Sequence, residues 1–561
     1  MDRREFILPK VPDAALSSLP VNLKNFDPAQ DAKSARSKIT STLAPWSPSA
    51  SEPWNVNRVN HLYRRVGFGA TPAEVSSALA LSYTDVVDAL LADALLLPAE
   101  LPERPRFHER WLEKPPYLGT DTQKQIEQAN EYYYAHQAIR RQWAEAMFEP
   151  STMLREKMVG FWMNHFVIES NKVYYPQTTY RYMEMLRKNA WGNFKQMVKD
   201  VTIQPAMLIY LDGYISYRGR PNENYARELL ELFTMGVTDK NGNANYTEFD
   251  IKEIARSLTG YTLDVTGQGE NVMAAVYNVV AHDASFKQPF GAPKKNYGLA
   301  SSGAAVVDII DLIFEKRAEQ IAWYMAHKLY ANFIYHSPST PAELAVVQQI
   351  ADLLQSSNWE MKPVLRAILT SAHFFDAANI GAGVKSPIEY VVGALRAFGI
   401  DDLNDLQAGT ITFYAGALEQ ILLDPPNVKG WIGGRAWAST TTLPLRNTYY
   451  ATQLLVLKQL AGQGATGYDG EMNQTILFGD AALLAWAKSF SKFNKTFDEF
   501  FTELAAFISP TMPSEKVKNT LILPKLPPNY YEWPSLPETD RIAPLRTMIR
   551  ELMLLAEYQL N

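Results

Sequence analysis

The stretch NENYARELLELF, residues 222–233, has the residue spacing of an amphipathic helix and indicates the fold class. Its polar residues fall at i, i+3, i+4 and i+7, which places them on one side of a helix: Asn224, Arg227, Glu228 and Glu231. Its apolar residues fall largely on the other side: Tyr225, Leu229, Leu232 and Phe233. The spacing predicts a helix that buries one face and carries a polar stripe on the other.

The same three- and four-residue spacing recurs along most of the chain. It predicts helices at 72–95, 121–149, 152–168, 177–189, 191–201, 222–235 and 248–259, more helices from 304 to about 460, and a final helix at 540–558. Residues 261–302 break the pattern with Gly, Pro, Asn and Val, so a short hairpin or irregular lobe is expected there. The sequence therefore predicts a mainly α protein, a multi-helix globular body with irregular insertions, some of them short β segments.

Composition divides the chain into three expected parts. Residues 1–53 are rich in Ser, Pro and Ala and are expected to form an extended N-terminal arm. Residues 54–460 form the predicted helical main domain, with the irregular lobe at about 261–302. Residues 461–561 form a loop-rich C-terminal segment whose final helix is expected to pack on the main domain.

Bulk properties exclude several classes of protein. The 561 residues are 47% hydrophobic and can bury a large core, while a net charge of −6 gives no basic field for nucleic acid. The chain has no cysteine, so disulfides, thiol nucleophiles and cysteine zinc sites are excluded. No run approaches 18 apolar residues, so no integral membrane segment is expected.

The N-terminal sequence MDRREFI places Arg3, Arg4 and Phe6 as in a twin-arginine export signal. The residues that follow lack the continuous apolar region that such a signal requires. The motif is incomplete, and whether it acts in export is left open.

The stretch DKNGNANYTEFD, residues 239–250, has two interpretations. It places oxygen-bearing side chains at the ligand positions of a calcium loop, which gives a candidate metal site for calcium: Asp239, Asn241, Asn243, Asn245 and Asp250. Ala244 stands where such a loop needs glycine, and Asp250 stands where a bidentate Glu is usual. The alternative is that Thr247 and Asp250 form a capping box for the next helix.

The polar stripe also has two interpretations. It is either a solvated face with an Arg and Glu pair or a buried network in which Glu228 or Glu231 acts as a ligand or general base. In the second case Asn222 or Asn224 would cap the helix. Asp212, in the preceding loop, could reach the same cavity.

Two histidines are further catalytic candidates. His165 follows Asn164 in REKMVGFWMNHFVI, among aromatic residues, where a hydrogen-bonded core histidine is the common alternative to a functional one. His282 and Asp283 are adjacent in AHDASFK, an HD pair of the kind found in metal phosphohydrolases. With the polar stripe, the catalytic candidates are His165, Glu228, Glu231, His282 and Asp283.

The stretch DPPNVKGWIGGRAW, residues 424–437, has the composition of a loop that lines a cleft. Its glycines permit tight turns and its tryptophans offer large apolar faces. A rigid loop fixed by the tryptophans is the alternative. The full set of binding candidates is Asn164, Asp212, Asn222, Asn224, Arg227, Lys385, Asn427, Lys429 and Trp431.

Several of these strings together resemble the bacterial family catalogued as domain of unknown function 1800. They include HLYRRVGFGATPAEV, REKMVGFWMNHFV, NENYARELLELFTMGV, VKSPIEYVVGALRAFG and DPPNVKGWIGGRAW, and the resemblance covers about residues 55–460 and the final helix. It implies a helical, commonly exported protein, a periplasmic or extracellular location rather than a cytoplasmic one, and a partner protein encoded nearby. The chain departs from the family pattern at Met163, where a His is usual, so any site that uses that His is weakened here.

Three hypotheses for function follow. The first is a non-catalytic extracytoplasmic binding or assembly protein with buried polar networks. The second is a hydrolase or lyase that acts on an extracytoplasmic polymer through a cleft of His, Glu, Asp and Asn side chains. The third is an adhesion or scaffold protein stabilised by calcium. A single catalytic site requires one pocket to hold four residues: His165, Glu228, His282 and Asp283.

Overall fold

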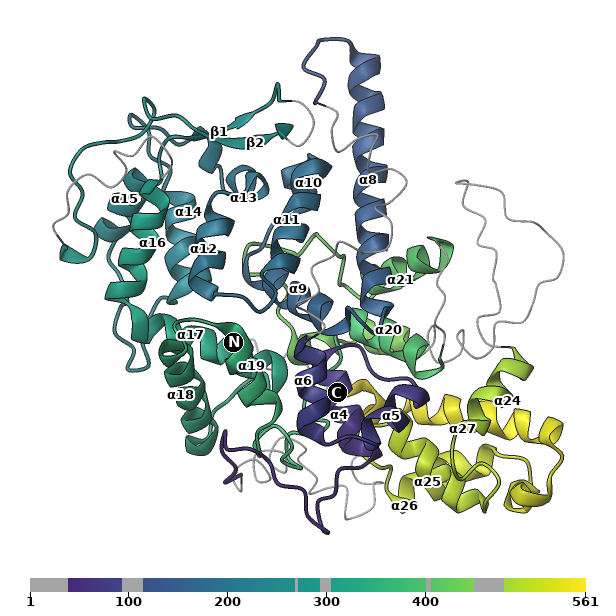
Figure 1. Ribbon diagram of the computed structural model, residues 1–561. Helices are drawn as coiled ribbons and strands as arrows, with labels where there is room; N and C mark the ends of the chain where they lie inside the picture. Colours follow the sequence, from purple (N-terminus) through teal and green to yellow (C-terminus); the bar gives the residue numbers. More distant parts are fainter. Residues whose placement is uncertain (1–38, 93–114, 268–270, 293–303, 400–404, 448–478) are drawn as a thin grey trace, which may run out of the picture.

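The computed structural model describes residues 39–92, 115–267, 271–292, 304–399, 405–447 and 479–561. The arginine motif, most of the expected N-terminal arm and part of the C-terminal loop fall outside these residues. The described part is a body of packed helices, with one two-stranded sheet at its edge (Figure 1). The predicted mainly α class is confirmed.

Local sequence signals explain where many helices begin. Thr71, Thr340, Ser386 and Thr496 each accept a hydrogen bond from the backbone N–H three residues on, and a glutamate at that position bonds back to the cap. The first half of the chain forms α4 (Val56–Val66), α5 (Pro72–Leu79), α6 (Tyr83–Ala92), α8 (Thr122–Phe148), α9 (Met153–His165), α10 (Ser170–Val173), α11 (Pro176–Lys188), α12 (Phe194–Thr202), α13 (Pro205–Tyr210) and α14 (Glu223–Glu228).

The second half of the chain is also helical. Its α-helices are α15 (Glu248–Ser257), α16 (Ala304–Lys316), α17 (Ala318–Phe333), α18 (Pro341–Ser356), α19 (Met361–Leu369), α20 (Pro387–Ala397), α21 (Asp405–Ala417), α22 (Thr442–Leu445), α24 (Asp480–Lys488), α25 (Phe497–Ile508), α26 (Glu515–Val517) and α27 (Ile542–Leu554). Short 3-10 turns connect several of them, including η3 (Gly213–Ile215), η6 (Pro289–Gly291), η7 (Gly434–Trp437), η10 (Leu523–Lys525), η11 (Tyr530–Ser535), η12 (Glu538–Arg541) and η13 (Ala556–Gln559).

The helix expected at 222–235 changes its winding halfway. It begins as α14 after Asn222, which accepts a hydrogen bond from Asn224 N at 2.9 Å, as predicted for a cap. It continues as a π-helix, η4 (Leu229–Thr234), in which Thr234 Oγ1 donates to Leu229 O at 2.6 Å. A second π-helical turn is η9 (Lys518–Ile522). A π-turn shifts the backbone carbonyls from their usual partners and is often found at functional sites.

The expected irregular lobe contains a short hairpin. Strand β1 (Tyr261–Asp264) pairs antiparallel with β2 (Ala274–Tyr277), and Tyr261 lies opposite Tyr277. Tyr261 is the buried residue of β1, so the hairpin rests on the helices through that end.

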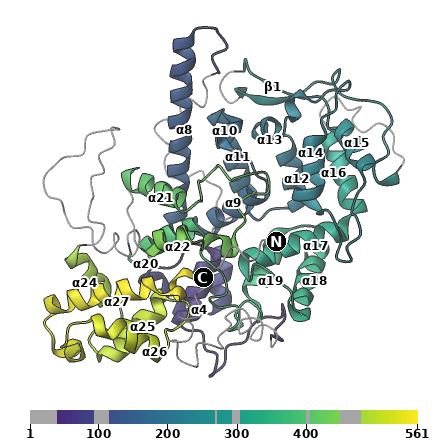
Figure 2. The ribbon, with the colours of Figure 1, turned by 180° about the vertical axis from the view of Figure 1, so that it is seen from behind.

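The two ends of the described chain pack together. Helix α25 lies against α4, and α27 lies against α25 and α24, so the C-terminal helices extend the body beside α4 and α5 (Figures 1 and 2). Within the described ranges, no helix has both the length and the apolar character needed to cross a bilayer.

Candidate functional site

A cavity of about 530 Å³ lies where five helices and one loop meet. Helices α4, α8, α9, α17 and α20 contribute to its wall, together with the loop of residues 424–438. We call it the central cavity. Its polar lining includes Arg65, Glu156, Lys157, Asn164, His165, Lys328, Asn332, His336, Glu389, Asn427 and Lys429.

Helix α9 carries two buried charges on the cavity wall, and each charge has a partner. Glu156 is fully buried and accepts hydrogen bonds from Arg187 Nε at 2.9 Å and Nη2 at 3.2 Å. Lys157 forms an ion pair with Glu389 of α20. Buried charges are tolerated when they are paired and hydrogen-bonded, and these pairs fix α9 against α11 and α20.

Asn164, at the end of α9, holds the loop that covers the cavity. Its Oδ1 accepts a hydrogen bond from Trp431 N at 2.7 Å, and its Nδ2 donates to Trp431 O at 3.4 Å. Gly430 has φ +81°, and a Cβ atom there would lie 2.2 Å from Asn164 Oδ1. Glycine is therefore needed at 430 both for the turn and for this close contact.

His165 is held by the π-helix. Its Nε2 lies 3.0 Å from Phe233 O, and its ring lies among Phe161, Phe166 and Phe194. Burial, and then the charge of Lys328, lowers the pKa of His165 well below its usual value, so the ring is neutral. A neutral ring that donates from Nε2 to the carbonyl has a free lone pair on Nδ1.

Three buried polar atoms of the cavity wall have no hydrogen-bond partner among the described residues. They are Trp143 Nε1, His165 Nδ1 and Asn332 Nδ2. Buried polar atoms are nearly always paired with protein, water or ligand, and leaving one unpaired costs about 1–3 kcal/mol. This cavity therefore presents two donors and one acceptor that a bound molecule can satisfy.

The lysines of the cavity add positive charge. Lys328 has no carboxylate within ion-pair distance in the described part of the chain, and it lies 5.4 Å from the centre of the Tyr324 ring. Burial lowers its pKa. Lys429 lies near the half-buried Glu228, whose pKa is raised by burial and by the charge of Glu231. Glu156 and Glu389 are already paired, and Lys328 has no carboxylate partner among the described residues, so an anionic group is a suitable partner for Lys328.

The structure brings five of the sequence candidates to the wall of the central cavity: Asn164, His165, Asn427, Lys429 and Trp431. Lys385 lines a second, smaller cavity next to it. Asp212 lies outside, with its carboxylate 3.7 Å from Lys172 Nζ. The other candidates lie outside both cavities and are described below.

Most of the polar stripe of α14 forms its own contacts outside the cavity, whereas Glu228 lies near Lys429 of the cavity wall without itself lining it. Arg227 donates to both carboxylate oxygens of Glu248, at 2.9 and 2.8 Å. Glu231 accepts a hydrogen bond from Tyr246 Oη at 2.5 Å, and Asn224 is exposed. Asn222 Nδ2 donates to Asp212 O at 3.0 Å. These contacts are those of a half-exposed face that joins α14 to α15.

His282 and Asp283 lie with the hairpin. His282 Nδ1 is 2.9 Å from Thr259 O, and Asp283 accepts from Arg256 Nε at 2.8 Å. Arg256, and then Ser285, lowers the pKa of Asp283 against the opposing effect of burial. Of the four residues required for a single catalytic site, only His165 lines the central cavity, so the structure does not bring them together.

The 239–250 stretch is held by contacts within itself. Asp239 accepts from Asn241 N at 2.8 Å, Asn243 N at 2.9 Å and Asn243 Nδ2 at 3.0 Å. Asn245 is buried and donates to Met235 O and Gly236 O. These side chains are thus engaged with their neighbours rather than with a common centre.

The end of the same stretch forms the predicted capping box. Thr247 Oγ1 accepts from Asp250 N, and Asp250 Oδ2 accepts from Thr247 N at 2.8 Å. In the described ranges no three His, Asp or Glu side chains cluster so as to hold a metal ion. The contacts favour the capping role, and calcium binding stays a prediction.

Several residues of the central cavity were missed by the sequence reasoning: Arg65, Trp143, Glu156, Lys157, Lys328, Asn332, His336 and Glu389. A signal was present for some of them. Lys328, Asn332 and His336 are spaced by four, which aligns them along one side of α17 and the turn after it. Glu156 and Lys157 are charges in a helix that is otherwise mostly apolar.

A family model described as "Protein of unknown function (DUF1800)" matches residues 61–532. The matched region includes nearly all of the central cavity's lining residues. No curated protein matches the chain, and no solved structure matches it.

Proposed function

The chain belongs to the DUF1800 family of proteins of unknown function, and from that premise we propose that it is a binding protein whose central cavity takes a hydroxylated organic anion. The observation that carries this proposal is the convergence, in one cavity of about 530 Å³, of three polar atoms and a lysine that have no partner among the described residues. A volume of this order suits a small organic molecule.

The chemistry of the wall supports a ligand of this class. Lys328 offers a cation to a carboxylate, and Asn332 Nδ2 and Trp143 Nε1 are hydrogen-bond donors for the same group. His165 Nδ1 is an acceptor for a hydroxyl. A sugar acid such as glucuronate has both groups.

The loop of residues 424–438 would lie over a ligand bound in the central cavity. It is anchored by Asn164 and carries Lys429, Trp431 and Trp437 on the cavity wall. The side chain of Ile432 is 89% exposed, so part of the loop faces solvent. A ligand bound beneath this loop would contact both a rigid helix and a glycine-rich segment.

A thermal-shift screen tests the proposal. The probes are uronic and aldonic acids, each paired with its uncharged counterpart, for example glucuronate with glucose. We expect acids to raise Tm and the neutral sugars to leave it unchanged, because ligands that bind the folded state raise stability. Absence of a shift with every acid of the panel would contradict the proposal.

Catalysis in the same cavity is the second candidate. It is supported by His165, a neutral imidazole with a free Nδ1 that could take a proton from a hydroxyl, next to the cationic Lys328. In this form, the hydrolase or lyase hypothesis depends on a single proton-accepting residue, His165. Turnover of a uronic-acid oligosaccharide by the wild type, and its loss in His165→Gln with ligand binding retained, would favour it.

We propose an extracytoplasmic setting for this binding function, as the arginine motif in MDRREFI supports. A protein partner encoded nearby fits the same setting. Fractionation of native cells tests the location: the chain in the periplasmic or extracellular fraction supports it, and the chain in the cytoplasmic fraction contradicts it.

A further inference from the structure

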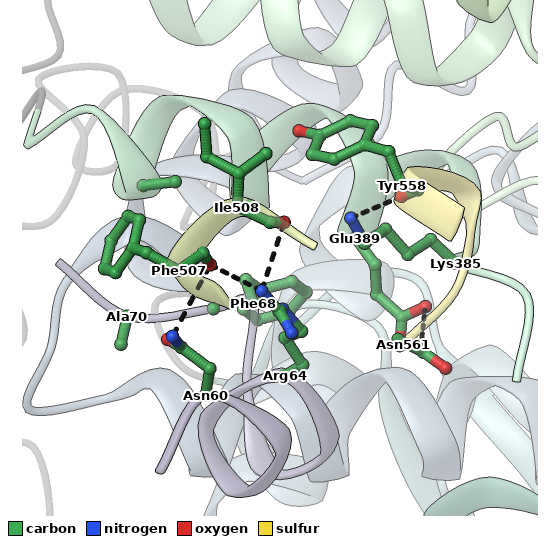
Figure 3. A pocket seen from close by; sticks show the side chains of 13 residues that line it. Asn60, Arg64, Phe68, Ala70, Lys385, Glu389, Phe507, Ile508, Tyr558 and Asn561 are labelled. Atoms are coloured by element: carbon green, nitrogen blue, oxygen red, sulfur yellow. Dashed lines mark hydrogen bonds between the residues drawn. The ribbon is translucent and has the colours of Figure 1, made fainter. Parts of the chain in front are cut away.

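A second cavity, of about 30 Å³, lies between α4, α20, α25 and the last residues of the described chain. Its wall includes Asn60 and Arg64 of α4, Lys385 and Glu389, and Tyr558 (Figure 3). We call it the small cavity. A space of this size holds about one water molecule or one small ion.

One side-chain nitrogen of Arg64 donates no hydrogen bond to the described residues. Its Nη2 donates to Phe507 O at 2.6 Å and to Ile508 O at 3.1 Å (Figure 3). Its Nη1 is buried and has no partner among the described residues. The residue is only 9% exposed, so a guanidinium with an unsatisfied donor lies on the wall of the small cavity.

Lys385 brings a second cation to the same wall. Its Nζ donates to Tyr558 O at 2.7 Å and lies 3.7 Å from the centre of the Tyr558 ring (Figure 3). An ammonium group has three donors, so this contact leaves hydrogen atoms for another acceptor. Within the described ranges, no carboxylate forms an ion pair with Lys385.

The surroundings are short of negative charge. Among the side chains that line the small cavity, Glu389 carries the carboxylate, and it is already held by Lys157, Asn561 Nδ2 and Ser386 N. Arg446 adds a third cation, with two buried nitrogens lacking a partner in the described part of the chain. Burial, and then the charges of Arg64 and Arg446, lowers the pKa of Lys385 well below its usual value.

Buried cations that outnumber their carboxylates are costly unless a counter-ion or a loss of charge compensates them. We propose that the small cavity binds one monatomic anion, chloride in the cell, held by Arg64 Nη1 and the Lys385 ammonium group. The anion satisfies the free donor of Arg64 and keeps Lys385 charged. The volume of about 30 Å³ favours a monatomic anion over a larger one.

This inference is independent of the proposed function, because organic acids bind in the central cavity, where Lys328 is the cation. A negative result for the anion site does not contradict the organic-acid site, and the reverse also holds. The direct test is a crystal structure of the full chain grown in sodium bromide, with data collected at the bromine absorption edge. We expect an anomalous peak in the small cavity within hydrogen-bond distance of Arg64 Nη1. A cavity with water only, and no anomalous peak, overturns the proposal.

Thermal unfolding gives a second, solution measurement. We expect 100 mM sodium bromide or chloride to raise the Tm of the wild type by about 1–2 °C over sodium gluconate at the same ionic strength. The difference should vanish in Lys385→Met and persist in Lys518→Met, which removes a similarly buried lysine that is paired with Asp498. Equal Tm values for the wild type in halide and gluconate overturn the proposal, whether or not Lys385→Met folds.

Discussion

Trp431 N donates a hydrogen bond of 2.7 Å to Asn164 Oδ1, and so joins the loop over the central cavity to the end of α9, 267 residues earlier. Asn164 Nδ2 in turn donates a hydrogen bond to Trp431 O. The paired contact fixes the backbone of the loop at Gly430 and Trp431, next to His165.

A methyl group at Gly430 should break that contact. Gly430→Ala adds a Cβ atom 2.2 Å from Asn164 Oδ1 and also strains a backbone with φ +81°. We expect the free energy of unfolding to fall by about 2–4 kcal/mol, as in other cases of overpacking with backbone strain. Urea denaturation measures it.

Gly242→Ala is the matched control. Gly242 has φ +85°, but no atom lies within 4 Å of its added Cβ. The free energy of unfolding of Gly242→Ala should fall by about 1 kcal/mol, because the added methyl group strains the backbone and meets no other atom. Equal losses for the two variants would show that the Asn164 contact is not tight.

Lys157 and Lys328 both line the central cavity, yet their removal should have opposite effects on stability. Lys157→Met leaves the buried Glu389 without its ion-pair partner, and we expect a loss of about 3–5 kcal/mol in the free energy of unfolding. Lys328→Met removes a buried cation that has no carboxylate partner in the described ranges, so stability should be unchanged or higher. Parallel denaturant titrations give the comparison, and a loss for Lys328→Met as large as for Lys157→Met would mean that Lys328 has a structural partner.

Buried neutral histidines should make the protein less stable in mild acid. Burial, and then the charge of Arg140, lowers the pKa of His136 to about 4, while the unfolded chain titrates near 6.5. Between these values the unfolded state binds more protons, so the free energy of unfolding falls as the pH is lowered from 6.5 towards 4.

Removing His136 should reduce that dependence. We expect His136→Gln to lower the slope of unfolding free energy against pH by up to about 1.4 kcal/mol per unit in this window. Urea titrations at several pH values measure the slope. Because the comparison is between slopes, a general loss of stability in the variant does not affect it, and an unchanged slope would mean that His136 is protonated in the folded state.

The capping box and the calcium loop predict different outcomes for the 239–250 stretch. If Thr247 acts as a cap, Thr247→Ala should cost about 1 kcal/mol whether or not calcium is present. Tm measured in calcium and in chelator should then be equal for the wild type. A rise of Tm in calcium that Asp239→Ala abolishes would instead support the calcium hypothesis.

Periodicity predicted the positions of most helices because each buries one face. It failed where local signals compete with it. The single helix expected at 72–95 is divided into α5 and α6, since Ser82 Oγ accepts from Asp85 N at 3.1 Å and begins a new helix. The π-turn of η4 leaves no mark on the spacing of residues, because one extra residue in a turn is decided by tertiary contacts.

The candidate site was only partly predictable for a similar reason. Asn164, His165 and Lys429 could be proposed because they stand in unusual polar strings, and they do line the central cavity. Lys328 stands in an ordinary helix, and its role depends on which side of α17 faces α9. The side of a helix that faces a distant segment is decided by the tertiary fold and not by the sequence of the helix alone. His282 and Glu228 have equally suggestive sequences, yet His282 lies with the hairpin, and Glu228, although near Lys429, does not line the cavity.

Isothermal titration tests most directly whether the central cavity binds a hydroxylated organic anion through Lys328. The panel acids are titrated into three proteins: the wild type, Lys328→Met and the exposed-lysine control Lys240→Met. We expect one binding site for at least one acid in the wild type and in Lys240→Met, and an affinity at least about tenfold lower in Lys328→Met, because that variant loses a charge-assisted contact. No binding of any acid to the wild type, or equal affinity for all three proteins, would contradict it.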